Sequence, residues 1–219
     1  ACSSTSALKE GQQLFTGLKP IEYSNYEKSG YADSTMLEME NVLASAPNGA
    51  LFGSSYYRTP FPVRLWIWNA FSQSEGGVAK WITKAFGSKP KLMSNVNPQL
   101  RAQVAENQLD KYGYFNGKVT YDVITDNNPK KAKVAYHVDM GHLWTLDTVK
   151  YLGFPNEGQQ LIDSTRNLAV IRTGSPFNVS RLEEERQRIT RLFRNNGYYF
   201  YKNGYASYLA DTLGTPGKA

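Results

Sequence analysis

Few side chains in this chain of 219 residues have the types and spacing that metal binding or catalysis requires. The two histidines, His137 and His142, have no cysteine near them, so a zinc site would need carboxylates from distant positions. The three glutamates at residues 183–185 are explained by the preference of negative charge for a helix N-terminus. The sequence contains no nucleophile elbow, P-loop or dinucleotide-binding motif. It therefore predicts a protein that is not an enzyme and that uses no metal and no cofactor.

The one cysteine, Cys2, is suited to a different chemistry. A lone cysteine forms no internal disulfide. The residues Ala1-Cys2-Ser3 resemble the start of a mature bacterial lipoprotein, in which a small residue precedes the acylated cysteine and a polar tether follows. We therefore expect lipidation at Cys2 and a lipoprotein-like tether over residues 1–11, the alternative being a cysteine without a role. No run of about 18 apolar residues occurs, so no membrane-spanning helix is expected.

The charge and the aromatic content leave a binding function open. The net charge is +6, yet no block of five or six basic residues occurs, and residues 130–133 are among the longest basic clusters. A solvated basic surface explains this pattern best. A nucleic-acid-binding module is the alternative, because sheets with exposed tyrosines stack bases and the chain has 15 tyrosines. The aromatic motif of RNA-binding sheets is missing, so we expect no nucleic acid as partner.

A short motif occurs twice, 84 positions apart, at residues 110–121 and 194–205. Each copy has a polar pair, a glycine, an aromatic run and a tyrosine eight residues after the glycine. The motif is typical of a joint in which a helix ends, glycine makes a left-handed turn and a strand begins. Its residues are Gly113, Tyr114 and Phe115 in the first copy and Gly197, Tyr198 and Tyr199 in the second.

Periodicity around these joints predicts an α+β fold with a repeating order of strand, helices and hairpin. Helices are expected at residues 34–46, 78–86, 98–112 and 157–166, and from residue 180 onward, where Ser180 and Glu183 form a capping box. Strands are expected at residues 14–23, 50–57, 63–71, 117–125, 132–138, 144–152 and 198–208.

The pattern F-x-V-x-x-L-E-x-E-R-x-R-I-T-x-L-F-R-N-x-G-Y-Y at residues 177–199 resembles the polypeptide-transport-associated (POTRA) domains of BamA/TamA-type outer-membrane assembly factors. Residues 107–119 match the same segment, and residues 65–69 (LWIWN) match a variant of the family. The resemblance implies three tandem β-α-α-β-β domains. They are expected at residues 12–75, 76–141 and 142–219, with the first degenerate and the last strand of the third incomplete.

The resemblance also implies a function. Such domains form the periplasmic arm of a factor that assembles or translocates outer-membrane proteins, and they bind unfolded clients or partner subunits by β-augmentation. The edge strands after the joints would do this, with Val119, Tyr121 and Val123 in one and Tyr199, Tyr201 and Tyr205 in the other. The side chains of Tyr121 and Tyr205 are expected to pack in the core.

The expected location is the periplasmic face of the outer membrane of a diderm bacterium. The links to that membrane would be a C-terminal β-barrel, which this chain lacks, and the lipid on Cys2. The alternative is a stand-alone periplasmic lipoprotein that docks another envelope complex.

Overall fold

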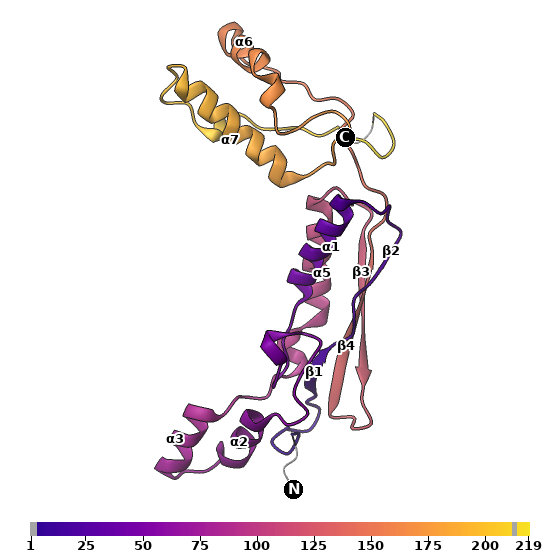
Figure 1. Ribbon diagram of the computed structural model, residues 1–219, viewed down its shortest axis with the longest axis vertical. Coiled ribbons are helices and arrows are strands. Elements are labelled where there is room, and N and C mark those ends of the chain that lie inside the picture. The colour runs from indigo at the N-terminus through magenta and orange to yellow at the C-terminus, as the bar shows by residue number, and fades with distance from the viewer. Residues whose placement is uncertain (1–3, 212–213) are drawn as a thin grey trace. The chain divides into compact units, whose positions relative to one another are not determined.

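The computed structural model (Figure 1) describes residues 4–211 and 214–219, so Cys2 lies outside the described residues. The fold is mixed α+β, as expected, and it divides into two compact units. Unit 1 contains the chain up to Asn107 together with Lys118–Asp139. Unit 2 contains Gln108–Gly117 together with Met140–Ala219.

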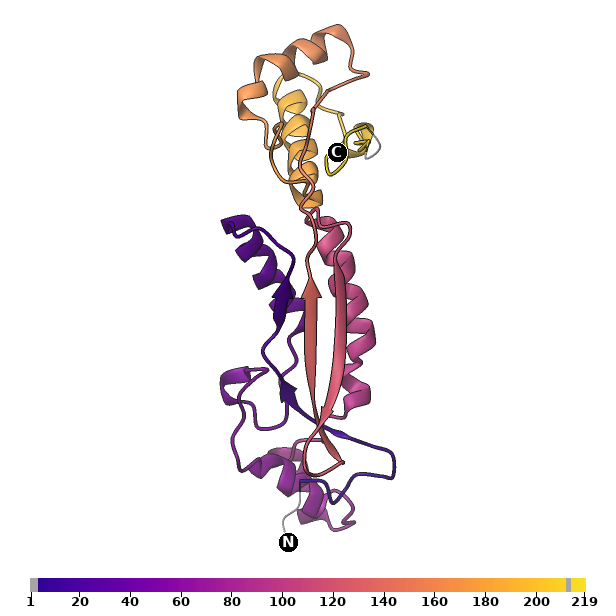
Figure 2. The same ribbon diagram turned by 90° about the vertical axis from the view of Figure 1, so that its right-hand side faces the viewer.

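Unit 1 is built on one small sheet whose central strand is β4 (Lys131–Asp139). Strands β1 (Leu14–Leu18) and β2 (Glu22–Ser24) run parallel to β4, one after the other along the same side. Strand β3 (Lys118–Thr125) pairs antiparallel with the other side of β4 (Figure 2). The expected hairpin at residues 117–125 and 132–138 is confirmed.

Two helices, α1 (Gly30–Leu43) and α5 (Pro98–Lys111), lie along one face of this sheet in both views (Figures 1 and 2). The buried residues of α1 recur every three or four positions, as an amphipathic helix requires. They are Ala32, Thr35, Met39 and Leu43. Ser29 caps the start of α1 by accepting a hydrogen bond from the Ala32 N–H. At the C-terminal end of α1, the Arg101 side chain of α5 donates hydrogen bonds to the carbonyl oxygens of Val42 and Ala44.

The order of elements in unit 1 is thus β-β-α-α-β-β, with a long insertion at residues 44–97 between the two helices. The insertion carries the helices α2 (Val63–Phe71), α3 (Gly77–Phe86) and α4 (Met93–Val96). The expected boundary after residue 75 falls inside this insertion. Because β1 pairs with β4, residues 12–75 and 76–141 share one sheet, and the chain has two compact units where three domains were expected.

Two of the predicted strands, both within the insertion, are not present in the structure, so these predictions are wrong. Residues 63–71 form helix α2. The strand was predicted there because both faces of this run are hydrophobic, and such a pattern fits a strand or a helix equally well. Residues 50–57 form a compact loop with a 3₁₀ turn, η1 (Leu51–Gly53), and a positive φ of 50° at Phe52. The Ser54 hydroxyl accepts hydrogen bonds from the N–H groups of Tyr56 and Tyr57, which closes the loop. The expected helix at residues 78–86 is confirmed as α3.

Unit 2 contains α6 (Asn156–Ser164) and α7 (Val179–Asn195), as expected, and they pack through Ile162, Ile189 and Phe193. The cap of α7 is Asn178, which accepts from the Arg181 N–H, and not Ser180. The expected strand at residues 144–152 is reduced to bridges at Thr145, which pairs antiparallel with Pro176 and parallel with Lys218.

The expected strand at residues 198–208 is also absent from the structure. Among the described residues of unit 2, no neighbouring strand offers it a ladder of backbone hydrogen bonds, and a single strand is not stable without one. Arginines of α7 bind its carbonyl groups: Arg194 donates to Tyr201 O and Arg186 to Asn203 O. The segment is therefore tied to α7 as a loop, with one 3₁₀ turn, η3 (Asn203–Tyr205).

The glycine joint is the same in both copies. Gly113 and Gly197 have φ of 89° and 95°, values that favour glycine. The N–H groups of Tyr114 and Tyr198 each donate to a carbonyl five residues earlier, on Leu109 and on Phe193, both at 3.0 Å. The motif is thus confirmed as a helix-ending turn, although only the first copy leads into a strand.

Candidate functional site

The strand after the first joint, β3, forms an edge of the sheet. Within residues 4–211 and 214–219, β4 is the one strand that pairs with it. An edge strand presents unpaired N–H and C=O groups to which an extended peptide can add. The candidate residues Val119, Tyr121 and Val123 therefore lie where the sequence placed them, on an edge.

Hydrogen bonds show which residues of β3 direct their backbone away from β4. The Asp126 N–H donates to Lys131 O across the hairpin, so the even-numbered residues of β3 bond to β4. The Val119 N–H donates instead to Oε1 of Glu106 on α5, at 3.0 Å. The odd-numbered residues from Val119 to Thr125 thus face outward. Glu106 occupies the first outward donor, and the open stretch begins at Tyr121.

On the opposite side of the sheet, the insertion blocks the edge of β1. The Phe15 N–H donates to Lys91 O and the Leu18 N–H to Ser55 O, each at 2.8 Å. Gly17 between them has φ of 122°, and a Cβ there would lie 2.9 Å from the Ser55 carbonyl oxygen. All of β1 is buried as a result. The long edge of β3 is therefore open where the β1 edge is not, and the three-residue strand β2 is the other exposed edge strand among the described residues.

The side chains of the open stretch are partly exposed. Tyr121 is 36% and Val123 40% exposed, so the expectation that Tyr121 packs in the core is wrong. These side chains share a face of the sheet with Tyr136 and Val134, their partners on β4. Those central residues are fully buried, whereas the edge strand is only partly covered.

The other face of the sheet is polar. His137 of β4 lies between two carboxylates, with Nδ1 3.0 Å from Glu22 Oε2 and Nε2 3.2 Å from Asp122 Oδ2. The two carboxylates contact opposite sides of the ring and do not converge on one point. In the described part of the chain, no three acidic, histidine or cysteine side chains are grouped as a metal site would need.

The second set of candidate residues does not form an edge. Tyr201 stacks on Phe193 of α7 with ring centroids 4.6 Å apart, and Tyr199 is exposed in the loop. Tyr205 is exposed as well, so its expected place in the core is wrong. The structure brings Val119, Tyr121 and Val123 together on one strand and leaves Tyr199, Tyr201 and Tyr205 in a loop along α7.

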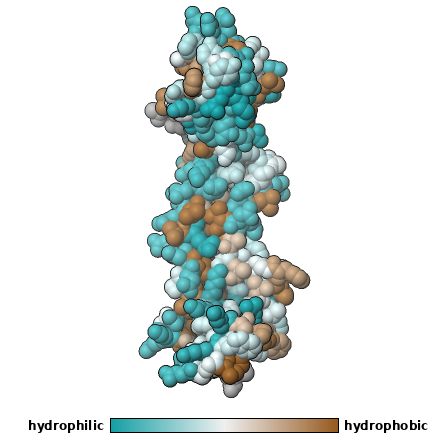
Figure 3. All heavy atoms as spheres, turned by 90° about the vertical axis from the view of Figure 1, so that its left-hand side faces the viewer, coloured by the Kyte–Doolittle hydropathy of each residue, from teal (hydrophilic) through white to brown (hydrophobic). Residues whose placement is uncertain are grey.

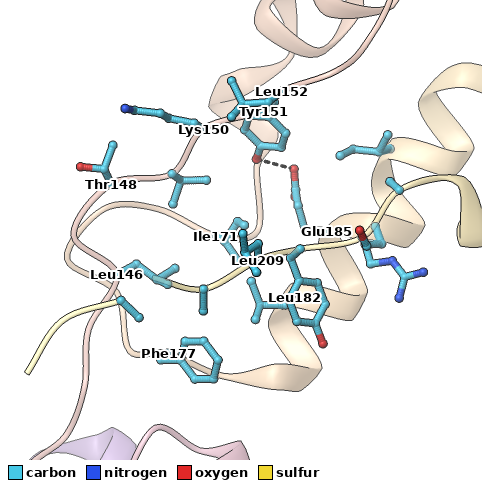
Figure 4. Close-up of a pocket in the computed structure, with 18 of the residues that line it drawn as sticks. Leu146, Thr148, Lys150, Tyr151, Leu152, Ile171, Phe177, Leu182, Glu185 and Leu209 are labelled. Carbon is cyan, nitrogen blue, oxygen red and sulfur yellow. Dashed lines mark hydrogen bonds between the residues drawn. The ribbon is translucent and has the colours of Figure 1, made fainter. Parts of the chain in front are cut away.

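This loop borders a pocket of about 390 Å³ in unit 2 (Figure 4). Its wall is mainly apolar and comes from α7, from the segments on either side of α6 and from the loop. The residues labelled there are Leu146, Thr148, Lys150, Tyr151, Leu152, Ile171, Phe177, Leu182, Glu185 and Leu209. The dashed line in Figure 4 joins the Tyr151 hydroxyl to Glu185.

Glu185 is the centre of a buried polar network that the sequence reasoning missed. Its side chain is 3% exposed and binds Arg188 through two short contacts, Nη2–Oε1 at 2.7 Å and Nε–Oε2 at 2.9 Å. The Tyr151 hydroxyl and the Val170 N–H also donate to it, at 2.7 and 2.8 Å. The sequence could have indicated its burial, because Glu185 lies three residues after Leu182 and four before Ile189, on the same buried side of α7.

The network shifts the pKa of its members. Burial alone would raise the pKa of Glu185, but the hydrogen bonds from Arg188, Val170 and Tyr151 outweigh it, and the pKa is lowered. Burial, and then the hydrogen bond to Glu185, raise the pKa of Tyr151 to about 12. Glu185 is therefore a charged structural acceptor, and the expectation that it serves as negative charge at a helix N-terminus is wrong, since α7 begins at Val179.

A lowered pKa in the folded state predicts acid sensitivity of unit 2. Glu185 contributes stability above its unfolded pKa of about 4.5, and this contribution is lost as the pH falls through the lower folded value. We expect the urea midpoint to drop between pH 5 and pH 3 by more in the native chain than in Glu185→Gln. Equal drops in both proteins would contradict this assignment.

None of the helices in the described residues has the length and apolarity needed to cross a bilayer. A comparison with models of known protein families finds no match to the chain, and a comparison with curated protein sequences finds none.

Proposed function

We propose that this chain is a periplasmic scaffold that binds extended segments of unfolded outer-membrane proteins or partner subunits by β-augmentation on β3. It would act as the arm of an outer-membrane assembly or translocation factor, with a lipid on Cys2 as a tether. The open edge of β3, between a capped start at Glu106 and the hairpin turn, carries the proposal.

Two structural observations and one general property of backbone pairing support it. The element order of unit 1 is similar to the β-α-α-β-β order of the POTRA domains that residues 107–119 and 177–199 resemble, if β1 and β2, which follow one another along β4, are taken as one strand. The insertion blocks the β1 edge, so an incoming strand finds free backbone groups on β3. Backbone pairing depends little on side chains, which suits a scaffold that receives many different clients.

A proline in β3 tests the edge. Val123 directs its N–H outward, so Val123→Pro removes a donor from the free edge and leaves the ladder to β4 in place. We expect the affinity for an extended peptide from an outer-membrane barrel strand to fall at least about 10-fold, through a lost hydrogen bond and the steric block of the ring. Fluorescence anisotropy of the labelled peptide measures this.

Three variants serve as controls. Val123→Thr keeps the backbone donor and should bind as the native chain does. Ile124→Pro removes a bond to β4 and should destabilise the fold, which circular dichroism detects. Tyr199→Pro, in the loop, should leave binding unchanged. Native affinity in a folded Val123→Pro protein would sink the edge assignment.

The peptide offers a second, independent test. Methylating its backbone nitrogens at alternate residues removes the donors of one edge and changes no side chain. One of the two alternating patterns should abolish binding and the other should preserve it. Binding that ignores both patterns would mean that side chains, not backbone pairing, hold the peptide.

A further inference from the structure

The insertion at residues 44–97 contains a pair of helices that bury little of their own apolar surface. α2 and α3 pack on each other, and their buried residues are Leu65 and Thr83 alone. Leu65 connects them to the rest of unit 1 through Leu8 and Leu14. The remaining aromatic and aliphatic side chains of the pair are exposed or half-exposed.

Helix α3 has its apolar side outward. Its buried residue is a threonine, whereas Val78 is 74%, Trp81 63% and Phe86 51% exposed. Trp81 and Phe86 are in edge-to-face contact with ring centroids 5.8 Å apart, which makes one aromatic patch. An amphipathic helix of a globular domain normally turns its apolar stripe to the core. This stripe is therefore free for a partner outside unit 1.

The charge of the insertion indicates what kind of partner. It holds six basic residues and one acidic residue, Glu75, which is nearly all of the chain's net charge of +6. Lys80 and Lys84 lie one turn apart on α3 and are exposed beside Trp81. In Figure 3, hydrophobic and hydrophilic side chains lie interspersed over this end of unit 1.

Exposed tryptophan and phenylalanine beside lysines on a short helix suit the interface of a bilayer. The rings enter the region between headgroups and acyl chains, and the lysines stay at the level of the phosphates. We propose that α2 and α3 form a membrane-contact surface, centred on Val78, Trp81 and Phe86, that binds bilayers containing anionic phospholipid.

The N-terminal segment lies near this helix pair, since Leu8 packs on Leu65 at the buried side of α2. Cys2 precedes Leu8 by six residues, and six residues span at most about 20 Å. A lipid on Cys2 would hold the chain to the same bilayer that α3 contacts. The surface does not depend on this lipid or on the β3 edge, so the test uses the chain without an acyl group.

Vesicle sedimentation tests the surface. We expect the chain to bind vesicles with about one third phosphatidylglycerol and to bind phosphatidylcholine vesicles weakly, with binding that falls as salt is added. Lys80→Glu with Lys84→Glu should weaken binding at least about 30-fold, because each lysine contributes about 5-fold. Trp81→Ser with Phe86→Ser should weaken it roughly 10-fold. All four side chains are exposed, so the fold should persist.

Controls separate the surface from general charge. Lys130→Glu with Lys131→Glu, at the β3–β4 turn, changes the net charge equally and should cost much less binding. The native tryptophan emission should shift to the blue on vesicles, and Trp81→Phe should bind as before but lose most of that shift.

Two results would overturn the proposal. One is the absence of vesicle binding at low salt. The other is binding that the α3 variants leave unchanged. Binding of an oligonucleotide or an acidic protein, with no binding of vesicles, would likewise assign the patch to that partner and reject the membrane surface. None of these outcomes bears on peptide binding by β3, so the two proposals fail separately.

Discussion

Replacing Arg188 by methionine is expected to lower the free energy of unfolding of unit 2 by about 3–5 kcal/mol. The change keeps much of the side-chain volume but leaves Glu185, 3% exposed, without its bidentate partner. Tyr151 and Val170 still donate hydrogen bonds to Glu185 in this variant. The main cost is therefore that a buried carboxylate has lost the positive charge that compensated it. Urea unfolding at pH 7, followed by circular dichroism, measures the loss.

Two comparisons isolate the cause. Lys218→Met removes an exposed ion pair with Asp147, at 3.2 Å, and should cost less than about 1 kcal/mol. Adding Glu185→Leu to Arg188→Met removes the stranded charge and should recover part of the loss. If the double variant is less stable than Arg188→Met alone, the stranded charge is not what destabilises unit 2.

The second large effect concerns the two glycine joints, which are alike in backbone but not in surroundings. Alanine at either position must adopt a positive φ, at a cost of about 1–3 kcal/mol. At Gly113 its Cβ would also lie 2.6 Å from Phe177 O and 3.2 Å from Trp144 O. At Gly197 nothing lies within 4 Å. We expect Gly113→Ala to cost about 1–3 kcal/mol more than Gly197→Ala.

Thermal and urea unfolding of the two alanine variants, side by side, measures this difference. Because the backbone cost is shared, the difference reports the crowding at Gly113 alone. Equal losses would mean that the carbonyl groups of Trp144 and Phe177 move aside without resistance.

Local patterns predicted much of the secondary structure. The alternation in residues 118–125 and the turn at residues 126–130 gave the hairpin, and the three-to-four spacing of apolar residues gave α5 and α7. The joint at Gly113 and Gly197 was visible because glycine marks a positive φ. Where both faces of a segment were apolar, as at residues 63–71, the periodicity was uninformative, and the helix was missed.

What the sequence hid was long-range pairing. Nothing in residues 14–18 indicates that their partner is β4, and this pairing merges two of the three expected domains. The edge position of β3 was expected only from the resemblance to POTRA domains, in which the first strand after this helix forms the edge. Glu185 was misjudged because three consecutive glutamates resemble surface charge, although one of them lies in the apolar stripe of α7.

The pairing of β1 with β4 also constrains the order in which the chain can fold. The Thr16 hydroxyl donates to Ala132 O across a separation of 116 residues. At a synthesis rate of about 5–20 residues per second, β1 waits on the order of 10 s for its partner strand. During that time its apolar residues, Leu14, Phe15 and Leu18, have no sheet to join. The chain that we propose as a scaffold for unfolded strands therefore has, during its own synthesis, an unpaired apolar strand that needs protection.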